Sequence, residues 1–368
     1  MGVMVDQRRQ RKKWIWGCTG GCLGFLIAGA VALYIIVQVL KRPVPLVPPE
    51  AFVAPQTEAF MFVRASPDDL LMIRLVGELA SMRSFLDRVP ARKGASVELS
   101  PERAREMVLQ TAPVQLVLIL QPGSAEGAFD RAAVLSIYRY SRLYGLVARS
   151  YMENAAGGAQ ARTSEYKGAL TAVTPDGRAL GIFQNNYMAA DQTSVIPYWV
   201  ERVIEERARQ KQPGPHQPLE MNAKEQLKAA YGRLDAADPV LFACLNSRGE
   251  LALLLSLMPQ GDPRALLEES GLTAKRVVSL GGELKGINDR DAVLTLFLEC
   301  ADASFAAQLQ AALTQVARAY AAESPFRDVK MTLAEGRVLK VEARVESLPE
   351  KVTSLVRYLM PRRGRPAA

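Results

Sequence analysis

The sequence predicts an α+β protein in which an N-terminal transmembrane helix precedes two related α/β repeat units with mostly antiparallel sheets. Three observations lead to this fold class. Residues 14–40 form one uncharged, largely apolar run, longer than the roughly 20 residues that a membrane-spanning helix needs. The rest of the chain alternates strand-like and helix-like runs, several of them joined by tight turns. A shift of 180 residues lays strand-like runs of one half over those of the other.

Residues 14–40 are predicted to be an uncleaved signal anchor. Five basic residues precede this run and only Lys41 and Arg42 follow it closely, so the positive-inside rule places segment 1–13 in the cytoplasm and the body outside. A cleaved signal peptide is the alternative, because the small residues around Ala30 fit a cleavage site. The apolar run continues past them, however, and exceeds the roughly 7–15 residues of a signal core. We therefore expect a single-pass membrane protein whose body lies outside the cytoplasm.

Three small residues of the predicted anchor share one helix face. Gly20, Gly24 and Ala28 recur every four residues. Small residues at this spacing let two helices approach closely, which would give a homodimer through the membrane helix. The alternative is that glycine is simply frequent in membrane helices.

The net charge of +8 is concentrated near the N-terminus. Residues 1–42 hold seven basic side chains against the single Asp6, and three further arginines lie in a predicted disordered tail, 361–368. The body between them is close to neutral, so it lacks the basic stripe by which folded domains bind nucleic acid. The charge instead favours contact with anionic headgroups, and the lipid bilayer is the expected partner.

Two proline-rich segments divide the chain. Residues 41–56 hold five prolines, which favour an extended polyproline II spacer that would keep the body off the membrane. Residues 213–221 are predicted to link a first extracytoplasmic unit, 57–212, to a second, 222–360. Two units are expected because the part outside the membrane exceeds what one average core supports.

The first unit is predicted to begin with a strand at 58–64. A helix capped by Ser66 and a helix opened by Ser100 follow, and the continuous apolar run 114–120 predicts a buried strand. Residues 132–140 fit either a strand or a helix. The remaining elements are a β-hairpin or short meander at 161–191, with its second strand at 179–190, and a helix at 195–210.

The second unit is predicted to begin with a helix at 222–235. Strands at 240–246, 275–285 and 292–300 follow, and glycines within 281–286 are expected to ease a bend or bulge. Phe305, Leu309 and Leu313 mark an amphipathic helix. Two strands flank Glu335-Gly336, and a last helix begins in a capping box at Ser347–Glu350.

The two halves show short matches at the shift of 180 residues. Residues 58–65 fall on 238–245, and residues 112–120 fall on 292–300. Similar Ala-Asp motifs at 190–193 and 301–304 each stand between a strand and a helix. These matches indicate an internal duplication, and chance similarity is the alternative.

Two cysteines, Cys244 and Cys300, lie in the body. The oxidising exterior of a cell would permit a disulfide between them. Both fall in predicted strands, and a bridge requires their α-carbons to lie within about 7 Å. The sequence leaves open a disulfide or two separately buried thiols.

Known chemical motifs are absent from the sequence. His216 is the single histidine and lies in a proline-rich segment, which excludes His-activated nucleophiles and the usual zinc sites. Ser164 and Lys167 match a Ser-x-x-Lys pattern, but in strand-like sequence their side chains point to opposite faces. We therefore predict no catalytic, cofactor-binding or metal-ligating residues.

Part of the sequence resembles a family of uncharacterised bacterial envelope proteins. The resemblance lies in Glu165-Tyr166-Lys167-Gly168, the hairpin through Gly181 to Asn186, Ala189-Ala190-Asp191 and the helix with Val203-Ile204-Glu205. It implies an α+β body outside a bacterial inner membrane, and it implies no activity. The absence of any N-glycosylation sequon also favours a bacterial source.

These observations favour a non-enzymatic, membrane-anchored binding or scaffold protein of the bacterial envelope, whose partner is an envelope protein or a ligand. One alternative is a carboxylate-dependent hydrolase of envelope polymer, which needs no histidine. Another is an assembly or sensing component that acts through its membrane helix. Two converging carboxylates of raised pKa would favour the hydrolase, whereas an exposed apolar surface would favour the binding protein.

Overall fold

The computed structural model describes residues 42–80, 101–123, 129–155, 163–175, 177–213, 218–248, 250–252, 265, 269, 275–319, 321 and 326–359. The predicted anchor with Gly20, Gly24 and Ala28, the tail 361–368 and His216 lie outside these residues. Within the described ranges, no helix is long and apolar enough to cross a membrane.

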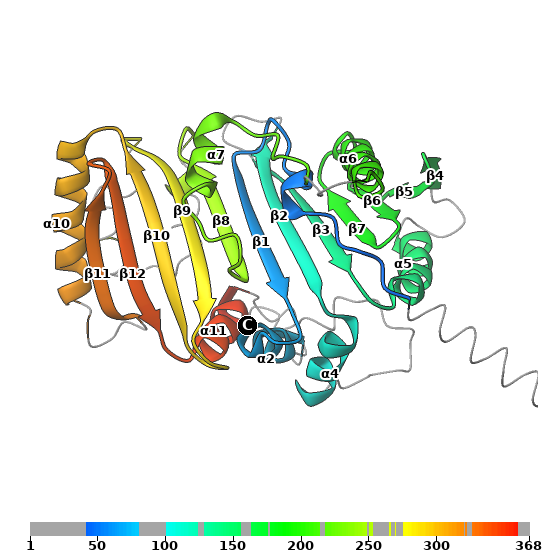
Figure 1. Cartoon of the computed structure of the whole chain (residues 1–368), viewed down its shortest axis with the longest axis horizontal. Helices are drawn as coiled ribbons and strands as arrows, with labels where there is room; N and C mark the ends of the chain where they lie inside the picture. The colour runs from blue at the N-terminus through cyan, green and yellow to red at the C-terminus, as the bar shows by residue number, and fades with distance from the viewer. Residues whose placement is uncertain are drawn as a thin grey trace, which may run out of the picture.

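All twelve strands form one sheet in the order β11-β12-β10-β9-β8-β1-β2-β3-β7-β6-β5-β4 (Figure 1). Every neighbouring pair is antiparallel, which confirms the prediction of an α+β fold with antiparallel pairing. The strands are β1 (Ala59–Ala65), β2 (Val114–Pro122), β3 (Phe129–Ile137), β4 (Thr163–Tyr166), β5 (Ala169–Val173), β6 (Ala179–Phe183), β7 (Asn186–Ala190), β8 (Val240–Leu245), β9 (Val277–Gly286), β10 (Ala292–Cys300), β11 (Phe326–Ala334) and β12 (Val338–Val345).

Helices pack on both faces of the sheet and at one end of its strands (Figure 1). They are the 3-10 helix η1 (Pro49–Phe52) and the α-helices α2 (Leu70–Ala80), α4 (Pro101–Thr111), α5 (Ser141–Ala155), α6 (Val195–Arg209), α7 (Glu225–Tyr231), α10 (Ala303–Ala319) and α11 (Leu348–Leu359). The helix α5 was not predicted from the sequence, and the segment 132–140 that fitted two states forms the strand β3. The predicted strand at 179–190 is two strands, β6 and β7, because the chain turns at Gln184, which has a φ of 56°.

The strand order is the same in the two halves when it is counted outward from the centre of the sheet. One half runs β1-β2-β3-β7-β6 and the other runs β8-β9-β10-β12-β11, and the central strands β1 and β8 pair with each other. In each half a helix follows the third strand, α5 after β3 and α10 after β10. The two halves therefore build one sheet across a shared strand pair.

The residue matches at a shift of 180 do not follow this order. That shift lays Phe60 over Val240, yet Val240 pairs with Val63 and so points to the face opposite Phe60. A register error of one residue flips every side chain in a strand to the other face. The second match lays β2 over β10, whereas the strand that follows β8 in the sheet is β9.

The two faces of the sheet are named here by neighbouring residues of β1. The Phe60 face carries Phe60 and Phe62 and is covered by η1, α6 and α7, whose side chains form the largest buried core. The Met61 face carries Met61 and Leu118. Helix α10 covers one end of the Met61 face, where Phe305 and Leu309 pack against a second buried cluster. Helix α5 covers the other end, where Met152 contacts β5 and β6.

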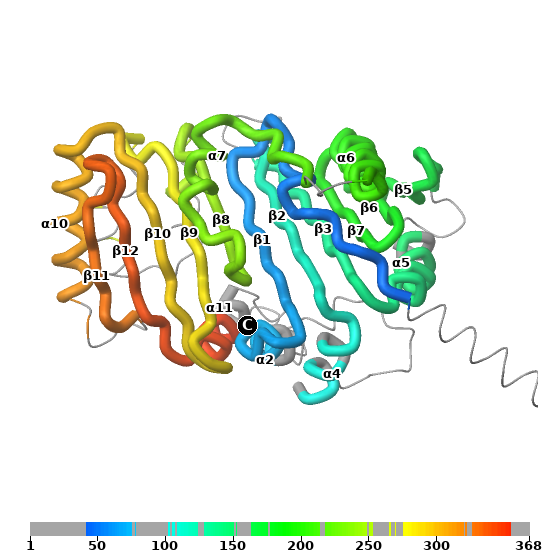
Figure 2. Tube along the Cα trace, in the orientation of Figure 1, coloured from blue at the N-terminus to red at the C-terminus, as the bar shows by residue number. Residues whose placement is uncertain are grey.

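The proline-rich segment 41–56 is not a spacer. Val47, Phe52 and Val53 are fully buried in the core of the Phe60 face. The Trp199 indole donates to the Phe52 carbonyl at 2.7 Å, and the Tyr198 hydroxyl donates to the Val53 carbonyl at 3.0 Å. Figure 2 shows this first described segment starting beside α5 and crossing toward the top of β1. Prolines favour the extended backbone here, but the apolar residues between them bind the sheet.

The adjacent glycines of β9 allow close packing and no bulge. A Cβ on Gly281 would lie 2.8 Å from the Ala230 carbonyl oxygen of α7, and a Cβ on Gly282 would lie 2.2 Å from the Phe242 ring. The two residues point to opposite faces of the sheet, so one glycine allows close packing on each face. The irregularity in this strand pair lies instead between Glu299 and Cys300.

Candidate functional site

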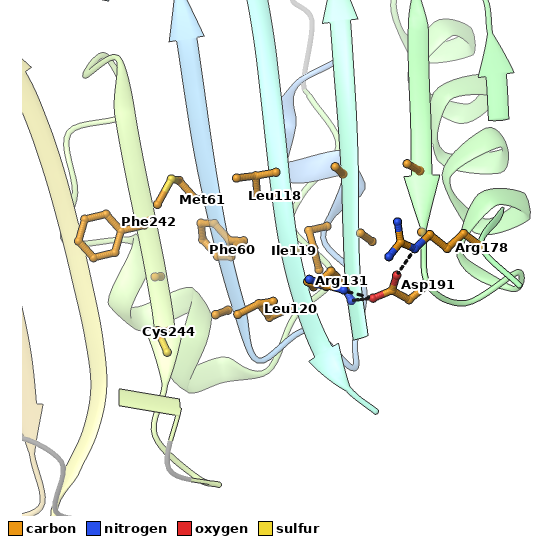
Figure 3. A pocket seen from close by; sticks show the side chains of 16 residues that line it. Phe60, Met61, Leu118, Ile119, Leu120, Arg131, Arg178, Asp191, Phe242 and Cys244 are labelled. Atoms are coloured by element: carbon orange, nitrogen blue, oxygen red, sulfur yellow. Dashed lines mark hydrogen bonds and ion pairs between the residues drawn. The ribbon is translucent and has the colours of Figure 1, made fainter. Parts of the chain in front are cut away.

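A cavity of about 440 Å³ lies on the Met61 face, over the strands β8, β1, β2, β3 and β7 (Figure 3). Its volume falls within the range of roughly 300–1,000 Å³ that small-molecule sites occupy. Five strands at about 4.8 Å spacing make its floor about 19 Å long across the sheet. The cavity is therefore elongated along the direction in which the strands pair.

One register row of the sheet forms the apolar floor. Met61 pairs with Phe242 on one side and with Leu118 on the other, and the row continues through β3 to β7. Met61 and Leu118 keep 38% and 39% of their surface exposed, which is unusual for large apolar side chains in the middle of a sheet. The complete row is Phe242, Met61, Leu118, Ala133 and Ala189.

The neighbouring row, two residues further along each strand, changes from apolar to charged. It begins at Cys244 and passes through Ala59 and Leu120 to Arg131. The Arg131 amide donates to the Asp191 carboxylate at 2.9 Å, and the Arg131 Nε donates to the same oxygen at 3.3 Å. Arg178 Nε lies 3.6 Å from the other Asp191 oxygen. Figure 3 shows this charged group at the end of the cavity opposite Phe242.

The charged end carries two cations and one anion. Burial alone would raise the pKa of Asp191, but the hydrogen bonds from Arg131 and the charges of Arg131 and Arg178 lower the pKa below its ordinary value of 3.8. Asp191 is therefore ionised at neutral pH, and the group has a net charge of +1. The Arg131 and Arg178 side chains are 70% and 58% exposed, so both guanidinium groups are accessible from the solvent.

The cavity suits an amphiphile with an anionic head. Its apolar floor would take a hydrocarbon chain, because removing that surface from water stabilises a complex by about 25 cal/mol per Å². Arg131 and Arg178 would bind a carboxylate or phosphate at one end, since guanidinium groups donate paired hydrogen bonds to such oxygens. Within the described ranges, no cluster of His, Cys, Asp and Glu fits a metal ion.

The structure does not favour acid catalysis in this cavity. Asp191 is the one carboxylate among the residues that line the cavity, and its pKa is lowered, whereas a general acid needs a raised pKa. Another pair of acids, Glu58 and Glu250, is buried near Cys244 and does not line the cavity. Ser247 Oγ lies 3.2 Å from Glu58 and 3.3 Å from Glu250, and Lys224 pairs with Glu58. These contacts indicate a structural role for the buried pair.

Cys244 and Cys300 are both free buried thiols. Cys244 pairs with Leu280 on one side of β9, and Cys300 pairs with Val277 on the other side. Two strand spacings alone separate the cysteines by about 9.6 Å, and the offset of their partners along β9 adds to this distance, whereas a disulfide needs its α-carbons within about 7 Å. The disulfide that the sequence left open is therefore excluded, and Cys244 instead lines the cavity.

The structure separates the Ser-x-x-Lys pair. Ser164 Oγ lies 2.7 Å from Thr171 Oγ1 on the neighbouring strand. Lys167 Nζ pairs with Glu201 at 2.8 Å, on helix α6. Each side chain thus has a different partner, because Ser164 lies on β4 whereas Lys167 lies in the turn that follows it, with a φ of 47°.

The sequence of the two central strands carries a signal for the cavity. In β1 and β2, large apolar residues occupy both strand faces. Such continuous runs predict burial on both sides of a sheet. Here the Phe60 face is buried, whereas the Met61 face forms an accessible apolar floor. Arg131, Arg178 and Asp191 come from three different segments, and the sheet order alone brings them together.

Comparison with known proteins yields no match to any family model, curated protein or solved structure.

Proposed function

We propose that this chain is a non-enzymatic, membrane-anchored binding protein that acts outside the cytoplasmic membrane of a bacterium. Its ligand would be an anionic amphiphile, such as a fatty acid or a lipid with an acidic headgroup. The observation that carries this proposal is the cavity itself: an apolar row across five strands, with Arg131 and Arg178 at the end away from Phe242. The anchor at residues 14–40 and the outside position of the body are proposed from the sequence, on length and on the basic residues before the span.

We also infer that the two halves are related by duplication. The support is the common strand order outward from β1 and β8, together with the equivalent places of α5 and α10. The cavity spans both halves, because β8 contributes Phe242 and Cys244 beside residues of β1, β2, β3 and β7. The binding site would thus depend on the joining of the two halves in one sheet.

The proposal can be tested by the binding of cis-parinaric acid, a fluorescent fatty acid, to a chain that begins at Arg42. Ala189→Trp places a large ring on the apolar floor at an exposed position, and we expect it to weaken binding at least tenfold, or about 1.4 kcal/mol. Leu333→Trp on β11 is the matched control, because Leu333 is exposed and lies far from the cavity. Equal binding by wild type and Ala189→Trp, with both folded, would contradict the proposed site.

The recognition of the ligand's anionic head by the arginines can be tested separately. We expect Arg178→Glu to weaken binding of the free acid about fivefold, close to 1 kcal/mol, and to leave binding of its methyl ester unchanged. Lys211→Glu makes the same charge change at an exposed position away from the cavity and should affect neither ligand. If Arg178→Glu weakens acid and ester equally, the arginines do not recognise the anion.

A further inference from the structure

Helix α5 carries an exposed apolar stripe. Leu143, Leu146 and Val147 follow the i, i+3, i+4 spacing that places them on one helix face. They are 43%, 64% and 63% exposed, and Leu146 and Val147 are the most exposed large apolar side chains of the described residues. A soluble surface seldom gathers such residues side by side.

The opposite side of α5 is packed, so this orientation of the helix is well defined. Met152 is 3% exposed and packs on the sheet with Ala172. The Tyr187 hydroxyl donates to the Ser141 carbonyl at 2.7 Å, which holds the first turn of α5 over β7. The apolar stripe therefore cannot turn inward without breaking these contacts.

Basic residues accompany the stripe. Arg142 and Arg149 lie on the exposed surface of α5, and Arg139 lies exposed just before the helix. No acidic residue occurs between positions 139 and 150. An apolar stripe bordered by arginines is the pattern of helices that lie in the interface of an anionic membrane.

The anchored end of the chain meets the body at this place. The Val44 amide donates to the Tyr138 carbonyl at 2.8 Å, and Asn185 Nδ2 donates to the Val44 carbonyl at 3.2 Å. Tyr138 stands three residues before α5, and Figure 2 shows the first described segment starting beside this helix. Val44 is four positions after Leu40, a reach of at most about 14 Å. Because residues 44–54 are packed on the sheet, no spacer separates the body from the predicted span.

We propose that α5 is a membrane-docking helix, which lies in the lipid interface with Leu143, Leu146 and Val147 among the acyl chains and its arginines at anionic headgroups. This inference rests on the anchor that forms part of the proposed function. The short tether would hold the bilayer at a high effective concentration beside α5, so a modest apolar area suffices for docking. The docked helix would fix the orientation of the body and bring the Met61 face, which α5 covers at one end, close to the lipid.

The test uses the full chain in vesicles of phosphatidylethanolamine and phosphatidylglycerol, with Cys18 and Cys22 replaced by Ser. Cys244 and Cys300 are buried, so an environment-sensitive fluorophore can be attached at Leu146→Cys. Leu333→Cys is the matched control, because Leu333 is 41% exposed and β11 lies at the opposite end of the sheet from α5 (Figure 1). Val147→Cys gives a second probe on the same stripe.

We expect the emission of the fluorophore at positions 146 and 147 to shift to shorter wavelength. We also expect lipids with a spin label near the headgroup to quench this emission several-fold more strongly than the emission at position 333. Protein that floats with the vesicles but shows equal, weak quenching at all three positions would overturn the docking of α5 and leave the anchor intact. A blue shift without lipid quenching would also overturn it and indicate that a second copy of this chain covers the stripe. Failure to float with the vesicles would overturn both the anchor and the docking.

Discussion

The thiols of Cys244 and Cys300 show how strongly the sheet controls individual side chains. Burial, and then the nearby charges of Glu250 and Glu58, raise the pKa of Cys244 to about 12 from an ordinary value of 9.0. Burial, and then the charge of Asp302, raise the pKa of Cys300 to about 11. At neutral pH both residues therefore stay as protonated thiols, although Cys244 lines the cavity.

We predict that neither thiol reacts with a disulfide reagent in the folded protein at neutral pH. A chain that begins at Arg42 should show no reactive thiol before denaturant is added and two reactive thiols afterwards. The absorbance of the chromophore that the reagent releases measures the number of thiols. The raised pKa of Cys244 also predicts the direction of a pH effect. Its contribution to stability is complete below pH 9 and is lost as the pH rises toward about 12, because the unfolded state releases the proton first.

Cys244→Ala provides the control for this pH effect. Its free energy of unfolding should decline less than that of wild type across the same alkaline range. A thiol that reacts in the folded state at neutral pH would show that the β8 strand opens more readily than its burial indicates.

Among the elements, the proline-rich segment before β1 differs most from its sequence-based interpretation. It binds the Phe60 face through Val47, Phe52 and Val53, and side chains of α6 donate hydrogen bonds to its carbonyl groups. In each half, a short helix precedes the first strand and covers the same face, η1 before β1 and α7 before β8. The segment is thus part of the folded body.

We predict that Phe52→Ala lowers the free energy of unfolding by about 3–5 kcal/mol, because it leaves a cavity against Trp199. Arg42→Ala, at an exposed position of the same segment, should change it by less than about 0.5 kcal/mol. Urea unfolding of chains that begin at Arg42 would measure both. An effect of Phe52→Ala as small as that of Arg42→Ala would restore the spacer interpretation.

The last helix illustrates a smaller difference at the same scale. The predicted capping box would pair Glu350 with the backbone of Ser347. In the structure the Ser347 amide donates to Asp291 at 3.2 Å, and Glu350 pairs with Arg74 of α2 at 2.8 Å. Asp291, just before β10, thus binds the Ser347 amide, and Arg74 of another helix binds Glu350, in place of the pairing within the helix that the local pattern predicted.

The molecule as a whole is one sheet shared by two halves. The strands β1 and β8 pair along five residues, and Tyr231 of α7 contacts Phe60 and Phe62 edge-on at 5.6 and 5.8 Å. Separating the halves would expose the hydrogen-bonding edge of β1 and these aromatic rings. Unpaired edges of this kind tend to associate with other chains.

We predict that a chain of residues 42–368 unfolds in a single transition, with far-ultraviolet circular dichroism and Trp199 fluorescence giving the same midpoint. A chain of residues 42–213 should aggregate or elute as large species in gel filtration, since its β1 edge lacks β8. Two separate transitions, or a folded monomer of residues 42–213, would show that the halves are independent domains.

The sequence by itself determined most of the secondary structure. Periodicity and turn residues were sufficient to predict β1, β2, α6, α10 and the β11–β12 hairpin, because the formation of these elements depends on neighbours within about ten residues. They also predicted the antiparallel pairing. The helix α5 escaped detection because its apolar stripe is exposed while small and polar residues such as Ser141 and Gly145 face the sheet. This reverses the pattern by which a soluble amphipathic helix is recognised.

Only the tertiary structure decided where the cavity lies and what lines it. Met61, Leu118 and Phe242 come together because β2, β1 and β8 are neighbours in the sheet, although they stand far apart in the sequence. The same holds for Arg131, Arg178 and Asp191, and for the burial of residues 44–54. Strand order and register depend on long-range contacts, which local propensity does not encode. The residue types were therefore readable from the sequence, but their assembly into a site required the fold.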